Sequence, residues 1–192
     1  MMPDYSDDIR LAVDTLRKGG LILYPTDTVW GIGCDACSSE AVRRVFALKR
    51  RADAKALITL VDSLATLERT VEEVPEVAYQ LIEVADKPVT IIYDSPRRGA
   101  VAPELTAADG SIGVRVTSEP FSQALCRAFR KPLVSTSANV SGAPAAACFA
   151  EISPEILEGV DYVCTSRRDE KAAASPSSVI KISSGGLFKI LR

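Results

Sequence analysis

Short apolar segments with strand character are interleaved with amphipathic segments of helical period along the whole chain. The two types do not alternate strictly, and the last two strand segments follow one another around Gly185 and Gly186. This order favours a mixed parallel and antiparallel sheet with helices on its faces, an α/β or α+β fold. No linker or repeat divides the chain, so we expect one domain over residues 1–192. Strands are expected at residues 21–24, 56–63, 89–94, 111–117, 132–137, 161–166, 177–183 and 187–192.

The expected helices begin at residues that can accept hydrogen bonds from the first backbone N–H groups. Ser6 or Asp7 can cap a first helix, which the two glycines after Lys18 end. Further helices are expected after Ser38, over residues 75–84, from Ser118 to Arg130, and, more weakly, before residue 161.

The charge balance argues against a protein that binds nucleic acid over its whole surface. The 23 basic and 25 acidic residues give a net charge of −2, so any anion site must be a local cluster. Apolar residues make up 47% of the chain, but no run is long enough to cross a membrane. The first residues are acidic and polar and do not resemble a secretory signal, so a cytoplasmic location is expected.

The five cysteines are odd in number and scattered, which favours free thiols in a reducing compartment. Cys34 and Cys37 have CxxC spacing, but a zinc site would need a second pair of ligands. A redox pair is an alternative to incidental cysteines near the core, and no metal site is predicted. The chain has no histidine, which excludes Ser-His-Asp and Cys-His catalysis.

Four polar clusters lie at or beside the expected strands, where open α/β sheets bind their ligands. Residues 24–33, YPTDTVWGIG, form an expected loop without the Asn-Gly or Asp-Gly turn of a plain hairpin. The clusters are Thr26, Asp27 and Thr28 in that loop; Lys49, Arg50 and Arg51 with Lys55; Arg115 within a strand; and Ser135, Ser137 and Asn139 after a strand.

Each cluster also has a purely structural interpretation. Basic residues at a helix C-terminus are favoured by the helix dipole, and hydroxyl-rich loops often bond their own backbone. Arg115 is harder to explain in this way, because a guanidinium between two valines calls for an anion. Together the basic, hydroxyl and amide groups predict a site for a phosphorylated substrate and a small polar one. Neither a Walker A loop nor a GxGxxG motif is present.

Five segments match the pattern of a known family in order and cover nearly the whole chain. They are PTDTVWGIGCDA (family PTETVYGLGADA), LKRRADAKALITLV (a K-x-R segment), SIGVRV (VGVRVP), STSANVSGAP (an S-x-N segment), and SPSSVIKI with the final ILR (STVVD…ILR). Each block alone is weak, but the set is specific. On these residues the chain resembles the YrdC-like threonylcarbamoyl-AMP synthases.

The resemblance implies a twisted mixed sheet with helices around a large concave cleft. It also implies a nucleotidyltransferase that makes threonylcarbamoyl-AMP and pyrophosphate from L-threonine, bicarbonate and ATP with Mg²⁺. Fixed cations and a divalent metal stabilise the charge on the phosphates, so no histidine is required. The product would serve the threonylcarbamoyladenosine modification of tRNA, with tRNA and threonylcarbamoyl-transferase proteins as possible partners.

The resemblance also assigns site residues. Lys49 and Arg51 would be catalytic, the loop hydroxyls would position threonine, and the loop glycines would let the backbone come close. The implied ATP-binding residues are Lys49, Arg51, Lys55, Ser111, Ser137, Asn139, Ala145 and Arg192. The implied threonine-binding residues are Thr28, Arg115, Ser135, Ser177 and Ser178.

Three departures from the family pattern leave other functions open. Leu60 stands where the family often has a histidine near threonine, Ala56 replaces a proline, and ADKP replaces a WPGP-type segment. The alternatives are a YciO-like paralogue that binds RNA or nucleotides with weak or different activity, a nucleic-acid-binding module, and a carbamoyl-adenylate domain like those of hydrogenase maturation proteins.

We predict that Arg51→Ala weakens ATP binding or turnover far more than Arg50→Ala. The K-x-R pattern implies that Lys49 and Arg51 face the cleft, while Arg50 is a solvated charge at the helix end. Loss of a charge-assisted hydrogen bond to phosphate is worth about 1.5–3 kcal/mol, about ten- to a hundredfold in affinity. Nucleotide titration of both variants measures this difference, and equal small losses would identify an ordinary basic helix terminus.

Overall fold

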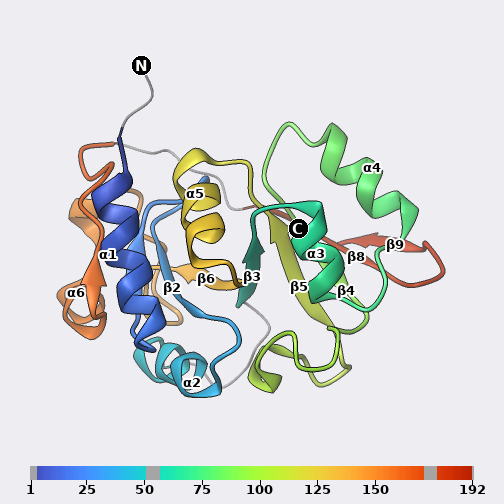
Figure 1. Ribbon diagram of the computed structural model, residues 1–192, viewed down its shortest axis with the longest axis horizontal. Coiled ribbons are helices and arrows are strands. Elements are labelled where there is room, and N and C mark those ends of the chain that lie inside the picture. The colour runs from blue at the N-terminus through green and yellow to red at the C-terminus, as the bar shows by residue number, and fades with distance from the viewer. Residues whose placement is uncertain (1–3, 51–56, 171–176, 192) are drawn as a thin grey trace.

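The computed structural model describes residues 4–50, 57–170 and 177–191. These residues form one sheet with helices packed on it (Figure 1), as predicted, but the sheet has nine strands where eight were expected. The helices are α1 (Ser6–Arg17), α2 (Ser39–Leu48), α3 (Leu64–Thr70), α4 (Glu76–Val84), α5 (Pro120–Phe129) and α6 (Pro154–Gly159), with short 3₁₀ turns η2 (Pro103–Leu105) and η3 (Phe149–Glu151). The strands are β1 (Ile22–Tyr24), β2 (Gly31–Asp35), β3 (Ile58–Val61), β4 (Val89–Tyr93), β5 (Ile112–Val116), β6 (Leu133–Ser137), β7 (Tyr162–Val163), β8 (Ser178–Ile182) and β9 (Phe188–Ile190).

The strand order is β7-β1-β2-β6-β3-β5-β4-β8-β9, and the sheet is mixed. The pairs β1–β7, β3–β5 and β4–β8 are parallel, while β1–β2, β2–β6, β3–β6, β4–β5 and β8–β9 are antiparallel. The predicted C-terminal hairpin is therefore confirmed. None of the helices in the described ranges is both long and apolar enough to cross a membrane.

Two apolar cores hold the helices to the sheet. The first packs Leu16 of α1 and Phe121 of α5 with β1, β2 and β6. The second packs Leu67 of α3 and Ala78 of α4 with β4, β5 and β8. Strand β3 joins them, because its alternating side chains send Leu60 to the first core and Val61 to the second.

Strand β2 corrects the prediction that residues 24–33 are all loop. Gly31 pairs with Tyr24 and Gly33 with Ile22, so only residues 25–30 connect the two antiparallel strands. A Cβ on Gly33 would lie 2.8 Å from Cε1 of the Tyr24 ring, and one on Gly31 would lie 3.4 Å from it. The two glycines therefore make room for a tyrosine ring. The Tyr24 hydroxyl donates to Oγ of Ser135 at 2.8 Å.

Two helix starts also differ from expectation. Glu119 caps α5, accepting hydrogen bonds from the backbone N–H groups of Phe121 at 3.0 Å and Ser122 at 2.7 Å. The unpredicted helix α3 begins after Ser63, which the sequence pattern places at the end of the preceding strand. Its hydroxyl accepts from the N–H of Thr66 at 3.3 Å, a capping signal that the sequence already contains.

We expect Gly33→Ala to lower the free energy of unfolding by about 1–3 kcal/mol, because the new methyl group overpacks the Tyr24 ring. Gly113→Ala is the matched control, since its Cβ would meet only Cγ2 of Thr90 at 3.6 Å, an ordinary contact. Both substitutions add one methyl group to a strand. Urea unfolding of the two variants measures the difference, and equal losses would contradict this account of Gly33.

Candidate active site

A cavity of about 930 Å³ lies over one face of the sheet. Along β4 and β8, Ile91 and Ile180 point into the second core under α3 and α4. Ile92 lies beside Gly113 on one side and Lys181 on the other, and all three line the cavity. Because side chains alternate along a strand, the cavity occupies the sheet face opposite α3 and α4.

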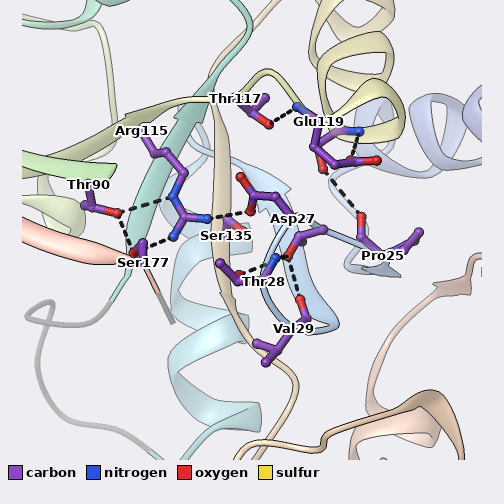
Figure 2. Close-up of polar contacts among 12 residues, drawn as sticks. Pro25, Asp27, Thr28, Val29, Thr90, Arg115, Thr117, Glu119, Ser135 and Ser177 are labelled. Atoms are coloured by element: carbon purple, nitrogen blue, oxygen red, sulfur yellow. Dashed lines mark hydrogen bonds and ion pairs between the residues drawn. The ribbon is translucent and has the colours of Figure 1, made fainter. Parts of the chain in front are cut away.

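Arg115 projects from β5 into this cavity although its side chain is almost fully buried. Its Nη1 donates to Oδ1 of Asp27 at 2.8 Å, and its Nη2 donates to Oγ of Ser177 at 2.9 Å. Its Nε donates to Oγ1 of Thr90 at 3.3 Å (Figure 2). Strict alternation with Ile112 and Val114, which are in the second core, places Arg115 on the cavity side.

Asp27 supplies the negative charge that a buried guanidinium requires. Burial raises the pKa of Asp27, and the nearby Glu119 carboxylate raises it further, while Arg115 opposes the rise. Sequence analysis placed Asp27 in a polar cluster but assigned it no ligand. The sequence separation of 88 between Asp27 and Arg115 explains why no local pattern revealed the pair.

The loop before β2 is held by its own hydroxyl groups and by contacts from later segments. Oγ1 of Thr26 donates to the carbonyl of Val29 at 2.6 Å and accepts from the N–H of Thr28 at 3.1 Å. Arg167 donates to the Thr26 carbonyl at 3.3 Å and to Glu119 at 3.0 Å. Thr26 therefore shapes the loop, whereas Thr28 lines the cavity.

The cavity gathers residues from both of the ligand sets that the family resemblance implies. Six of the assigned residues line it: Thr28, Ser111, Arg115, Ser137, Ala145 and Ser177. Ser135 and Ser178 do not line it; Ser135 accepts the Tyr24 hydroxyl, and alternation along β8 turns Ser178 away from the cavity side. Arg51, Lys55 and Arg192 lie outside the described residues, as does Ala56.

Lys49 does not face the cleft, contrary to expectation. Its side chain is 1% exposed, and its Nζ donates to the backbone carbonyls of Ser137 at 2.5 Å and Asn139 at 2.7 Å. The amide of Asn139 in turn donates to the carbonyl of Ala143 at 2.6 Å. Lys49 and Asn139 therefore stabilise the backbone at the end of β6 and in the loop that follows it. The exposed Arg50 pairs with Glu155 at 2.8 Å.

Sequence reasoning missed a second charged group of the cavity. Nζ of Lys181 lies 2.7 Å from Oδ2 of Asp109, whose Oδ1 accepts the Ser111 hydroxyl at 2.5 Å. All three residues line the cavity. The alternation in SVIKI carries the signal, because Ile180 and Ile182 mark the core face and leave Lys181 on the other.

The cysteines do not favour the redox alternative. Cys34 and Cys37 are both free, and Cys37 donates to the carbonyl of Ala100 at 3.3 Å. Burial raises the pKa of Cys37 to about 11 and that of Cys34 well above its usual range, with Asp35 adding to both. Both thiols are therefore protonated near neutral pH, whereas disulfide exchange needs a thiolate.

The chain is similar to proteins of one family over nearly its whole length. The profile of the Sua5/YciO/YrdC family, described as telomere recombination, matches residues 14–192. The threonylcarbamoyl-AMP synthase of Stenotrophomonas maltophilia is 38% identical over 167 residues, 86% of this chain and 89% of that protein. The protein of the same name from Vibrio cholerae is 38% identical over 151 residues, 78% of this chain and 80% of that one.

Solved structures show the same fold. P. abyssi Sua5 complexed with L-threonine matches with a TM-score of 0.85 and 26% identity, over 96% of this chain and 53% of that one. E. coli YciO matches with a TM-score of 0.84 and 26% identity, over 100% of this chain and 90% of that one. The chain thus spans about half the length of Sua5 and most of YciO. From the profile match and these relatives, the chain belongs to the Sua5/YciO/YrdC family.

Proposed function

We propose that this protein is a threonylcarbamoyl-AMP synthase, a nucleotidyltransferase that converts L-threonine, bicarbonate and ATP into threonylcarbamoyl-AMP and pyrophosphate. The observation that carries the proposal is a buried, cavity-lining arginine among hydroxyl groups, in a chain 38% identical to synthases over most of its length. The cavity of about 930 Å³ lies near the upper end of typical ligand sites, so a nucleotide and a small amino acid fit together.

Different residues of the cavity lining suit different parts of the reaction. Arg115, Thr28 and Ser177 would offer charge and hydroxyl groups to the carboxylate of threonine. Ser137, at the end of β6 where Lys49 holds its backbone carbonyl, would face ATP together with Arg51 and Lys55 of the K-x-R segment. A side chain held in place in this way costs little reorganisation when the phosphates develop charge.

Mg²⁺ would enter with the phosphates of ATP. In the described part of the chain no group of three acidic or cysteine side chains is arranged to hold a metal ion. We therefore assign it no protein ligand. The ion would neutralise charge on the transferring phosphoryl group and on the departing pyrophosphate.

Partners and location follow from the proposed reaction. Threonylcarbamoyl-AMP is an activated intermediate, so its use in tRNA modification requires a transferase protein and tRNA in the same compartment, which for this chain would be the cytoplasm. An acidic protein would meet tRNA through a local surface, because its net charge of −2 provides no general attraction.

A YciO-like protein that binds RNA or nucleotides is the second candidate. It is favoured by the match to E. coli YciO over the whole of this chain. Leu60 gives further support, since it lies beside Arg115 in the parallel β3–β5 pair and is 1% exposed. This position, where the family often has a histidine, therefore offers the amino acid no polar group.

We expect release of pyrophosphate from ATP that requires both threonine and bicarbonate. A coupled pyrophosphate assay with each substrate omitted in turn measures this requirement. Threonylcarbamoyl-AMP should appear in equal amount by mass spectrometry. Release that is equally fast without threonine would rule out the synthase and favour the YciO-like candidate.

We expect Arg115→Lys to raise the threonine concentration for half-maximal turnover about ten- to a hundredfold, because an ammonium cannot reproduce the guanidinium fork. It should keep most of the stability, since the charge opposite Asp27 remains. Arg115→Gln should lower the free energy of unfolding by about 3–5 kcal/mol, because Asp27 is left buried and unpaired.

Urea unfolding and threonine titration of the same preparations separate the two effects. Arg127→Lys is the control, since Arg127 is an exposed arginine on α5 whose nearest carboxylate is 3.8 Å away. A large loss of stability in Arg115→Lys with normal threonine dependence would show that Arg115 is only structural.

A further inference from the structure

Arg115 and Asp27 place opposite charges side by side where the loop before β2 meets the cavity (Figure 2). Arg115 bonds to Asp27, Thr90 and Ser177 through one N–H group each. A guanidinium has five N–H donors, so two are not used by these partners. A carboxylate that enters the cavity can therefore bond to Arg115 without displacing Asp27.

Asp27 has a corresponding unused acceptor. Oδ1 contacts Arg115, while Oδ2 accepts no hydrogen bond from another residue of the described ranges (Figure 2). The Asp27 side chain keeps 16% of its surface exposed, whereas that of Arg115 keeps 6%. Its chain neighbour Thr28 lines the cavity. Asp27 does not itself line the cavity, but its carboxylate lies 2.8 Å from Nη1 of the cavity-lining Arg115, so a ligand bound by Arg115 lies next to the Asp27 carboxylate.

The charge surroundings of Asp27 favour a second cation. Glu119 is close enough to disfavour the ionised form of Asp27, and Arg167, which pairs with Glu119 at 3.0 Å, makes no bond to Asp27. An ionised carboxylate in a mostly buried position is stabilised by every hydrogen-bonded positive charge it gains. Arg115 is the one cation bonded to Asp27 among the described residues.

An α-amino acid near neutral pH carries an ammonium and a carboxylate group on the same carbon atom. A neighbouring arginine and aspartate present the matching pair of charges. We infer that Asp27 binds the α-ammonium group of the amino-acid substrate while Arg115 binds its carboxylate. This inference rests on the proposed function and adds a residue to the threonine site. It explains why the ion pair lies at the cavity and not within a core.

The competing explanation is that Asp27 only fixes the position of Arg115. The two roles differ in which part of the ligand senses Asp27. A structural Asp27 acts through Arg115 and affects every carboxylate ligand equally. An ammonium-binding Asp27 affects only ligands that carry the ammonium group.

The test is calorimetric titration of the full chain with two ligands. One is L-threonine, and the other is 2,3-dihydroxybutanoate, in which a hydroxyl replaces the ammonium. The wild-type protein should bind threonine at least about tenfold more tightly. Asp27→Asn keeps an oxygen for Arg115 but loses the charge. It should weaken threonine binding about ten- to a hundredfold and change dihydroxybutanoate binding by less than about threefold.

Asp62→Asn is the matched control, because Asp62 also lies near an arginine and its side chain is 20% exposed, but that arginine, Arg127, does not line the cavity. It should leave both affinities unchanged. Equal losses for the two ligands in Asp27→Asn, or no loss for threonine, would overturn the inference. If that variant does not fold, the wild-type protein decides: dihydroxybutanoate bound as tightly as threonine overturns the inference.

Threonine binding and pyrophosphate release distinguish a failure of the proposed function from a failure of this inference alone. A wild-type protein that binds no threonine and releases no pyrophosphate contradicts both the proposed function and this inference. Threonine-dependent pyrophosphate release together with unchanged threonine affinity in Asp27→Asn contradicts the inference alone.

Discussion

The cavity depends on the hydrogen bonds that hold the buried guanidinium of Arg115. A charge removed from water is costly unless charged and hydrogen-bonding partners replace the lost solvent. Here Asp27 comes from the loop before β2, Thr90 from β4 and Ser177 from the start of the C-terminal hairpin. These three segments are far apart in sequence, so the requirement to solvate one side chain ties the N-terminal loop to the last strands.

Lys49 fixes the backbone at the end of β6 in a similar way. Its ammonium is buried against the carbonyls of Ser137, the last residue of β6, and of Asn139 in the following loop, and its own carbonyl accepts the N–H of Ser141 at 2.9 Å. The residue that follows helix α2 therefore holds the strand end at which Ser137 lines the cavity. A cation that resembles a phosphate ligand in sequence is thus used by the chain for its own backbone.

The sequence was informative where structure follows from local pattern and misleading where it follows from distant contacts. Alternation and capping residues predicted the mixed sheet and the C-terminal hairpin. Strand β2 was missed because Gly31 and Gly33 are typical of loops, and their role depends on the ring of Tyr24 in the neighbouring strand. Arg115, which the family resemblance assigns to threonine, does line the cavity, but the direction of Lys49 depends on carbonyls 88 and 90 residues away.

Two acidic and two basic side chains lie close together around the loop before β2. Asp27 faces Arg115, Glu119 lies nearby and disfavours the ionised form of Asp27, and Arg167 pairs with Glu119. Arg167 adopts a left-handed backbone with φ of 62°, a conformation that costs a non-glycine residue about 1–3 kcal/mol. Its bonds to Glu119 and to the Thr26 carbonyl offset that cost. Arg167 thus links the segment after β7 to the start of α5 and to the loop before β2, so the surroundings of Asp27 are built from segments that are far apart in sequence.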